Sequence, residues 1–412
     1  MIDLQRIRDH SEQVKQSLQR RGLDTEIVDE IAELDEEYRA RLGELNALQA
    51  QRNAQSSKKP TDAERAALKT LATHIRKMES DIAVLESRIE TRMHHIPNIL
   101  LDDVPNGADA SANVVEHTVG NIPSFDFDIE DHLTIGERLG MIDMDSASKV
   151  SGSRFAYLKG DAVLLQFALV NYALSVLTAE KFVPIIPPHL ISIEAMRAMG
   201  YLDKGGEEVY HMKSDDLVLI GTSEQSIGPM HMNEQMDPGL FPLRYVGISP
   251  CYRREAGSYG KDIRGILRLH QFDKIEMFSF TSPSASDGEH LFLLEMQERL
   301  MQGLQLPYRV VKLCAGDTGW SSARTYDIET WMPSQKQYRE THSTSTTTDF
   351  QTRRLKVRVK RGKGQYAHAL NGTAFAIGRT LIAILENGQE ADGRMRIPDV
   401  LQPFMGHRTH VG

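Results

Sequence analysis

The stretch SPCYRREAGSYGKDIRGILRLHQFDKIEMFSF, residues Ser249 to Phe280, joins two apolar runs through a basic, glycine-rich loop. The runs, 243–252 and 271–280, have the composition of β-strands. The loop offers little that can be buried, so the hairpin predicts polar side chains gathered where two antiparallel strands end. The residues that give the loop its character are Gly257, Gly260, Gly265, Lys261, Arg264 and Arg268.

Four side chains at the roots of this loop are candidates for a binding site. Glu255 follows Arg253 by two residues, and Glu276 follows Phe272 by four, so each pair shares one face of a strand. Arginine can bind a carboxylate or phosphate through two hydrogen bonds, and a phenylalanine ring gives a base a surface to stack on. An isolated Arg-x-Glu is more often a surface ion pair, so the other segments have to be considered with it.

The composition indicates an ordinary soluble protein. The 412 residues are enough for two or three domains, with 40% hydrophobic and 25% charged residues. No run approaches the ~20 apolar residues of a membrane helix, and the charged start does not resemble a secretory signal. Two cysteines, Cys251 and Cys314, favour a reducing cytoplasm. A net charge of −9 requires any nucleic-acid site to concentrate its positive charge locally.

Residues 1–97 have the pattern of a helical domain. Apolar residues from Leu68 to Ile89 are spaced alternately by three and four, and residues 31–48 show the same heptad period. Pro60 and Thr61 end one helix and cap the next. We expect an antiparallel coiled-coil arm of roughly 45 Å. Packing of this hairpin on its own domain is the alternative, and the polar residues off the seam favour a projecting arm.

A linker, residues 98–120, precedes a predicted α+β domain, 121–412. Residues 163–180 have the pattern of a long buried helix, and 369–388 that of a strand running into a helix that stops at Asn387-Gly388. Hairpin-length separations predict a mainly antiparallel sheet flanked by helices. The segments with strand character are LVLIGTSE, PLRYVGIS, KIEMFSF, RVVKLC, TYDIETWMP and RRLKVRVKR.

Common phosphate-binding and hydrolase motifs are absent from the sequence. It contains no Gly-x-x-x-x-Gly-Lys-Ser/Thr, no Gly-x-Gly-x-x-Gly at a strand–helix junction, no Gly-x-Ser-x-Gly and no His-Glu-x-x-His. A nucleotide would therefore have to bind on the antiparallel sheet itself.

From Met1 to about Gly406 the chain resembles the bacterial-type seryl-tRNA synthetases, a family of class II aminoacyl-tRNA synthetases. CYRREAGSYGKDIRG…HQFDKIE resembles motif 2 of that class, NGTAFAIGRT motif 3, and FVPIIPPHLIS motif 1, which builds the dimer interface. LIGTSE, KVSGSRFAYLKGD, YDIETWMPSQ and TDFQTRRL match further segments. The resemblance implies a cytoplasmic homodimer that makes seryl-adenylate from L-serine and ATP. The seryl group then passes to the 3′ end of serine tRNA, with selenocysteine tRNA as a further candidate.

The resemblance also assigns an ATP site. It implies two catalytic arginines: Arg253 would hold the α-phosphate and the serine carboxylate, and Arg379 would lie beside the adenine and near the γ-phosphate. Glu255 would contact the adenine amino group and Phe272 would stack on the base. The implied ATP-binding set is Arg253, Arg254, Glu255, Phe272, Glu340, Thr341, His342, Ser343 and Arg379, with Glu340 and Ser343 as Mg²⁺ ligands.

Serine recognition is implied for a second set. Glu224 would face the ammonium, while Glu276 and Thr373 would bind the hydroxyl group. Buried acceptors for that hydroxyl would reject alanine, because one of them would be left unpaired. The implied serine-binding residues are Thr222, Ser223, Glu224, Arg253, Glu276 and Thr373.

The sequence departs from the family pattern at several places. THSTSTTTDF follows Glu340 where the family usually has a serine- and cysteine-rich stretch, and His342 stands where serine is usual. Gly221-Thr222-Ser223 replaces a more usual Pro-Thr-Ala or Gly-Thr-Ala. The turn of the arm is short, which leaves the reach of the arm open.

Local positive charge is present for tRNA binding. Residues 353–363, RRLKVRVKRGK, contain seven cationic side chains and no acidic one, although alternation along a strand would place part of them on a solvated face. Such groups give salt-dependent phosphate contacts, and a long arm suits the recognition of RNA shape. The arm turn and the motif 2 loop add Arg52, Lys58, Lys59, Arg254, Lys261, Arg264 and Arg268.

Three alternatives remain to be weighed. An inactive RNA-binding relative would be expected to lose a residue of the set Arg253, Glu255, Glu276, Glu340 and Arg379, all of which are present. A coiled-coil scaffold would explain only residues 26–96. Ligases that load amino acids onto carrier proteins lack the arm and use cysteines at a zinc site, whereas Cys251 and Cys314 lie in separate predicted strands.

Overall fold

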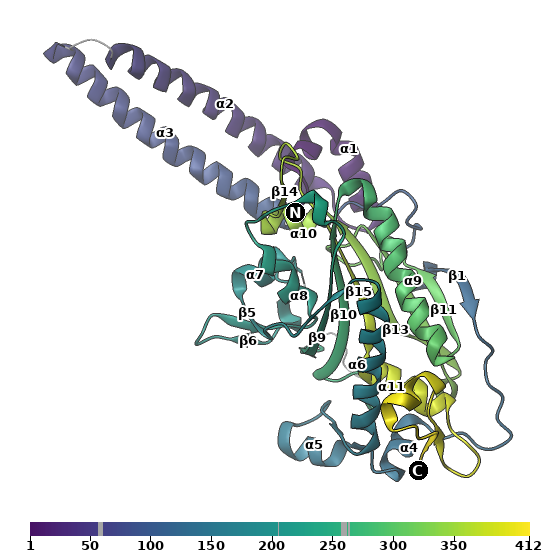
Figure 1. Cartoon of the computed structure of the whole chain (residues 1–412). Coiled ribbons are helices and arrows are strands. Elements are labelled where there is room, and N and C mark those ends of the chain that lie inside the picture. The colour runs from purple at the N-terminus through teal and green to yellow at the C-terminus, as the bar shows by residue number, and fades with distance from the viewer. Residues whose placement is uncertain (57–60, 205, 257–261, 263) are drawn as a thin grey trace. The chain divides into compact units, whose positions relative to one another are not determined.

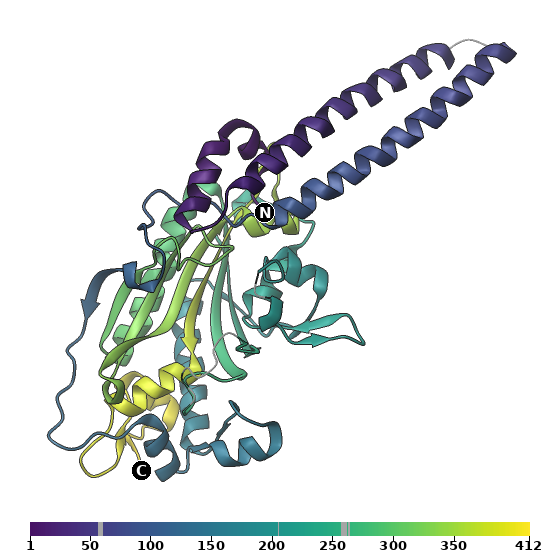
Figure 2. The same ribbon diagram turned by 180° about the vertical axis from the view of Figure 1, so that it is seen from behind.

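The computed structural model describes residues 1–56, 61–204, 206–256, 262 and 264–412 (Figures 1 and 2). The chain forms two compact units, Met1–Ile99 and Leu100–Gly412. Several residues named above lie outside the described part: Lys58, Lys59, Pro60, Gly257, Gly260 and Lys261.

The first unit consists of three helices, α1 (Leu4–Arg20), α2 (Glu26–Ser56) and α3 (Asp62–His94). Helices α2 and α3 are antiparallel, since Arg92 pairs with Glu30 near one end and Gln49 with Glu79 further along. The predicted heptad residues meet between them, with Leu45, Ile75, Met78 and Ile82 buried in one cluster. The Thr61 side chain caps α3 in a reciprocal capping box with Glu64.

A buried carboxylate ties α1 to the hairpin. The Asp35 side chain on α2 is only 1% exposed and lies 2.6 Å from the Arg8 guanidinium of α1 and 2.9 Å from that of Arg39. A carboxylate buried to this degree needs such partners. The contact therefore fixes α1 against α2.

The second unit is built on an eight-stranded sheet in the order β1-β11-β12-β13-β15-β10-β9-β4. All neighbouring strands are antiparallel except the β4–β9 pair. The strands are β1 (Val114–Val119), β4 (Val183–Ile185), β9 (Leu243–Tyr252), β10 (Gln271–Thr281), β11 (Tyr308–Lys312), β12 (Arg324–Met332), β13 (Gln337–Thr348) and β15 (His368–Ala376). The predicted antiparallel sheet is confirmed, and β1 falls within the predicted linker.

Helices cover both faces of this sheet (Figure 1). One face packs on α6 (Asp161–Ala179), α9 (Ser286–Leu304) and α11 (Ile377–Asn387) to form the largest apolar core. On the other face, α7 (Ile193–Ala198), α8 (Glu224–Ile227) and α10 (Phe350–Leu355) pack around Phe278 and Phe280 of β10. The smaller elements are α4 (His132–Arg138), α5 (Met144–Ser151), β2 (Ile142–Asp143), β3 (Tyr157–Leu158), β5 (Leu190–Ser192), β6 (His211–Met212), β7 (Leu217–Leu219), β8 (Gln235–Met236), β14 (Arg358–Val359), β16 (Met395–Arg396) and β17 (His410–Val411).

Two predicted strands differ from the structure. The strand expected over 353–361 is wrong at its start, because Leu355 ends helix α10 and only Arg358–Val359 forms a strand. The buried Phe350 and Leu355, together with the Arg353–Asp349 ion pair one turn apart, support the helix. LVLIGTSE is a strand only over Leu217–Leu219, and Glu224 opens helix α8.

Helix α6 was expected to be fully buried, and it is buried on one side only. Leu165, Ala168, Leu169 and other residues enter the core, whereas Phe167 is 57% exposed. Within the described residues, α6 is also the one helix with the length and apolar composition of a membrane span, contrary to the expectation that no run comes close. Core helices of soluble proteins meet the same two criteria, so the observation is weak evidence for a membrane.

Truncating the coiled-coil seam is expected to destabilise the helical hairpin selectively. Ile75→Ala removes a side chain that is 1% exposed, at a cost of about 2–5 kcal/mol. Hydrogen exchange of the amides of α2 and α3 in the full chain measures the loss of protection. Val84→Ala on the same helix, where the side chain is 57% exposed, is the matched control and should stay within about 0.5 kcal/mol. Equal losses of protection in the two variants would contradict the burial of Ile75 between α2 and α3.

Candidate active site

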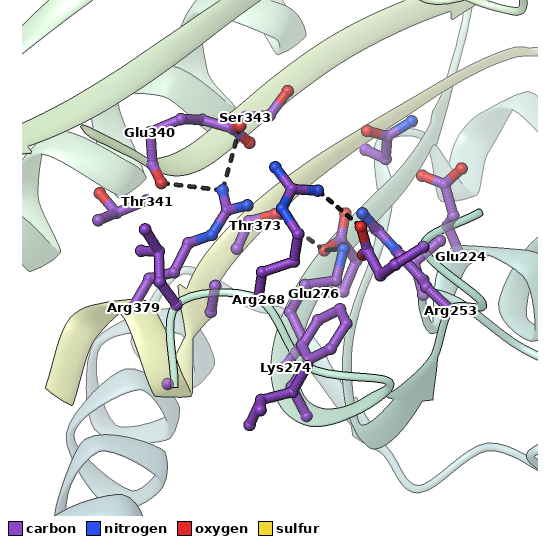
Figure 3. A pocket seen from close by; sticks show the side chains of 18 of the residues that line it. Glu224, Arg253, Arg268, Lys274, Glu276, Glu340, Thr341, Ser343, Thr373 and Arg379 are labelled. Carbon is purple, nitrogen blue, oxygen red and sulfur yellow. Dashed lines mark hydrogen bonds and ion pairs between the residues drawn. The ribbon is translucent and has the colours of Figure 1, made fainter. Parts of the chain in front are cut away.

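A cavity of about 260 Å³ opens on the face of the sheet that carries α7 and α8. Strands β10, β13 and β15 form its floor, and residues following β9, the first turn of α8 and the start of α11 form its walls. Figure 3 shows Glu224 and Arg253 at one end and Glu340, Thr341 and Arg379 at the other. Eleven residues from the predicted sets line it: Thr222, Glu224, Arg253, Glu255, Phe272, Glu276, Glu340, Thr341, Ser343, Thr373 and Arg379.

Strand alternation brings one row of these residues to the cavity. Phe272, Lys274 and Glu276 are successive residues of one face of β10, and all three line the cavity. Ile275 and Met277 occupy alternate positions of the same strand and are fully buried in the core on the opposite face. The same strand therefore supplies both the apolar core and the polar site.

Two β-bulges bring further side chains onto the cavity face. The register of β12 against β13 shifts at Thr341, so Glu340 lies opposite Glu329 while His342 lies opposite Ile328. In a regular strand Glu340 and Ser343 would point to opposite faces, and the extra residue allows both to line the cavity. A second shift, between β10 and β15, places Thr373 opposite Glu276.

The deep end of the cavity contains two buried carboxylates and their partners. Glu224 and Glu276 are each 2% exposed. The Lys274 ammonium lies 2.5 Å from Glu276, the Thr373 hydroxyl donates to Glu276 over 3.2 Å, and the Tyr201 hydroxyl donates to Glu224. Burial, and then the neighbouring charge of Glu276, raise the pKa of Glu224 to about 7.

Arg253 stands between this end and an aromatic surface. Its guanidinium carbon lies 5.4 Å from the centre of the Phe272 ring, and its Nε donates to the Gly221 carbonyl over 3.3 Å. Glu255 accepts a 2.6 Å hydrogen bond from Arg268, a residue predicted only as a tRNA contact. A flat ring, a carboxylate and two guanidinium groups together suit a purine and its phosphates.

The far end contains oxygen donors and a third arginine. Arg379 donates to the Glu340 carbonyl over 2.9 Å and lies 3.1 Å from its carboxylate. Burial acts to raise the pKa of the Glu340 carboxyl group. The positive charge and hydrogen bond of Arg379 act in the opposite direction, and the net result is a lowered pKa. Burial, and then Glu340, raise the pKa of the neighbouring Asp327 well above its usual range. Within the described ranges no three His, Cys, Asp or Glu side chains are placed to hold a metal ion.

Comparison with known proteins identifies the family. Residues 1–100 match the seryl-tRNA synthetase N-terminal domain and residues 208–388 match the class II tRNA synthetase core domain (G, H, P, S and T). A serine–tRNA ligase of Acidothermus cellulolyticus is 44% identical over 413 residues, which is 98% of each chain. The chain belongs to the seryl-tRNA synthetase family. It is therefore a ligase of the class II aminoacyl-tRNA synthetases.

Two solved structures of the family are similar over the whole chain. Seryl-tRNA synthetase from Pyrococcus horikoshii, complexed with ATP, has a TM-score of 0.95 at 37% identity and covers 100% of this chain and 99% of its own. The cytoplasmic serine–tRNA ligase of Naegleria fowleri, in complex with AMP, has a TM-score of 0.92 at 33% identity, with 100% and 98% covered.

Three predicted site residues lie outside the cavity lining. Ser223 is fully buried, with its hydroxyl 2.7 Å from that of Ser249; Gly247 allows this approach, since a Cβ there would lie 2.6 Å from the Ser223 Cβ. His342 faces the core on the far side of the bulge, where its ring packs against Phe375 and burial lowers its pKa to about 4. The Arg254 side chain is exposed, and its amide donates to the Glu208 carbonyl.

Several lining residues were missed from the sequence. Lys274 precedes Glu276 by two residues on a strand, so alternation could have placed it on the same face. Asn371 of β15 lies two residues before Thr373, so strand alternation could have placed it on the same face as well. Tyr201 follows α7 in a turn and carried no periodic signal at all.

Removing the cation at the deep end is expected to destabilise the fold. Lys274→Met leaves Glu276 without its closest partner and beside Glu224, and breaking a buried pair in this way costs about 3–5 kcal/mol. Denaturant unfolding measures the change. Adding Glu276→Gln should recover part of the loss, while Lys213→Met at an exposed lysine should have little effect. Additive effects of Lys274→Met and Glu276→Gln would show that the two groups do not interact.

Proposed function

We propose that the cavity activates L-serine with ATP and passes the seryl group to serine tRNA. The observation that carries the proposal is the division of one cavity between two kinds of partner. The buried carboxylates Glu224 and Glu276 line one part of the cavity, and Arg253, beside Glu224, lies 5.4 Å from the Phe272 ring. Arg379 and Glu340 lie at the opposite end (Figure 3).

The deep end fits serine. Glu224 would accept from the ammonium, and Glu276 with Thr373 would bind the hydroxyl group. Alanine has no hydroxyl group to bond to Glu276 and Thr373, and a site built to hydrogen-bond a substrate hydroxyl rejects such an analogue strongly. Arg253 is placed to hold the carboxylate.

The other end fits ATP. Adenine would stack on Phe272 with Glu255 at its amino group, and Arg253, Arg268 and Arg379 would neutralise the phosphates. Arg268 lies 2.6 Å from the Glu255 carboxylate, so its guanidinium group is in the same part of the cavity as the proposed adenine position. In the family, the structure from Pyrococcus horikoshii is complexed with ATP.

The reaction would proceed in two balanced steps. A serine carboxylate oxygen attacks the α-phosphorus and the bond to the β-phosphate oxygen breaks, which gives seryl-adenylate and pyrophosphate. A ribose hydroxyl at the 3′ end of tRNA then attacks the acyl carbon, its proton passes to the phosphate of the departing AMP, and the bond from the acyl carbon to that phosphate oxygen breaks. Both steps depend on alignment and on charge stabilisation, which fixed guanidinium groups provide.

Mg²⁺ fits the donor set beside Arg379. The Glu340 carboxylate and the Ser343 hydroxyl both line the cavity, and the nearby Asp327 has a buried Oδ1 with no hydrogen-bond partner among the described residues. Oxygen donors of this kind, completed by phosphate and water, suit Mg²⁺. Glu340 and Ser343 would hold the ion, which would supply charge neutralisation at the phosphates.

Further partners follow from the surfaces of the two units. We propose that the α2–α3 hairpin and the exposed cations Lys356, Arg358, Lys360, Arg361 and Lys363 bind tRNA through its phosphates. Arg354 of the same run is buried against Asp203 and takes no part. We also propose a cytoplasmic homodimer formed around α6 and the segment from β4 to β5, which are in contact. Apolar side chains there are 43% to 81% exposed, as an unpaired interface would be: Leu164, Phe167, Val183, Ile186 and Leu190.

Serine-dependent ATP–pyrophosphate exchange without tRNA tests the proposal. We expect exchange with serine, and exchange with alanine or glycine at least about 10³-fold weaker in kcat/KM, because these two amino acids lack the hydroxyl group that the site is built to bind. Glu276→Ala should abolish the preference for serine over alanine. Phe404→Ala, at a partly exposed aromatic outside the cavity lining, is the control.

Two results would contradict the proposal. Folded protein that supports no exchange with any amino acid would favour an RNA-binding relative without adenylation. Exchange with serine that persists in Glu276→Ala with unchanged selectivity would move serine recognition to other residues.

A further inference from the structure

Tyr201 enters the cavity from the turn that follows α7. Its hydroxyl donates a hydrogen bond to Oε1 of Glu224, and its side chain lines the cavity at the end with the buried carboxylates. Neither the strand pattern nor the family motifs singled this residue out. The contact is therefore an addition to the serine end of the site.

The turn is anchored on both sides of Tyr201. Gly200 has φ +90°, and a Cβ there would lie 3.3 Å from the Phe350 ring, so the backbone passes close to α10. Beyond Tyr201, the Asp203 carboxylate pairs with Arg354 of α10, both side chains being almost fully buried. Arg354 also donates to the Arg197 carbonyl at the end of α7, over 3.0 Å. These contacts fix the position of the tyrosine hydroxyl.

The charges around Glu224 make this hydroxyl important. Glu276 repels the Glu224 carboxylate, while Lys274 and Arg253 attract it. Burial and Glu276 raise its pKa to about 7, and the Tyr201 hydrogen bond acts in the opposite direction. An ionised carboxylate with a fixed orientation is the form that accepts hydrogen bonds from an ammonium group.

We propose that Tyr201 is a positioning residue for the amino-acid substrate, because its hydroxyl holds the Glu224 carboxylate in the orientation that receives the serine ammonium. The inference rests on the proposed role of Glu224. It assigns no chemistry to the tyrosine itself, whose role is to hold Glu224.

Tyr201→Phe tests the inference in the ATP–pyrophosphate exchange assay. The KM for serine should rise about tenfold, the effect of one lost hydrogen bond to a charged group, with kcat and the KM for ATP changed less than about twofold. The acid limb of kcat/KM for serine should move to higher pH. The limb moves in this direction because loss of the hydrogen-bond donor favours the protonated carboxyl group, so a higher pH is needed to ionise Glu224.

The matched control is Tyr245→Phe. Tyr245 is a mostly buried tyrosine whose hydroxyl lies 2.8 Å from His231 Nε2, away from the cavity lining. It should change neither the KM for serine nor the pH profile. Should Tyr201→Phe prove unstable in thermal unfolding, Asp203→Asn loosens the same turn while keeping the hydroxyl. It should then raise the KM for serine in the same direction.

The outcomes separate this inference from the function on which it rests. If Glu224→Gln raises the KM for serine and Tyr201→Phe leaves the KM and the pH profile unchanged, the inference is overturned and the serine site stands. If Tyr201→Phe lowers kcat or raises both KM values alike, the residue is merely structural and the inference is also overturned. An unchanged KM for serine in Glu224→Gln would overturn the role of Glu224 and the inference with it.

Discussion

The ion pair between Lys274 and Glu276 is the interaction on which the arrangement of the cavity depends. Two carboxylates, Glu224 of α8 and Glu276 of β10, are buried in the lining of one cavity, and a buried charge is tolerated only when it is paired and hydrogen-bonded. Lys274 lies on the same face of β10 and supplies the pairing charge. Lys274 neutralises Glu276, and the Glu224 carboxylate remains able to accept a cationic group.

The fold provides this arrangement through small irregularities in an otherwise regular sheet. Strands β10 and β15 place core residues on one face and site residues on the other. The bulge at Thr341 then turns Glu340 and Ser343 to the same side, and the second bulge brings Thr373 opposite Glu276. Bulges are frequent beside active sites because they redirect individual side chains without changing the sheet. The proposed positions of adenine, phosphate and amino acid depend on these few shifts.

The sequence predicted the features that depend on period. The heptad spacing from Leu68 to Ile89 predicted an antiparallel helical pair, and alternation predicted that Phe272 and Glu276 share a face. The β-bulges interrupt the alternation of side chains, so the sequence period could not predict them. Periodicity places Glu340 and Ser343 on opposite faces, and only the family resemblance paired them. His342, assigned to ATP by its neighbours in the motif, packs in the core because the bulge ends before it.

Tertiary context decided the remaining differences. The run 353–361 alternates as a strand does, yet Phe350 and Leu355 are buried on one side of a helical turn, and that burial outweighs the local pattern. Tyr201 lies in a turn whose position is set by a glycine and by a buried ion pair from a distant helix. Long-range contacts of this kind leave no periodic trace in the sequence.

The central claim is that one cavity binds the seryl and adenosine parts of seryl-adenylate side by side. Calorimetric titration with a sulfamoyl analogue of seryl-adenylate, compared with its alanyl counterpart, tests it most directly. The structure predicts one site per chain, tighter binding of the seryl compound by about 100-fold or more, and loss of that preference in Glu276→Ala. Equal affinity for the two analogues in the unaltered protein would contradict the account, because the buried acceptors would then play no part in recognition.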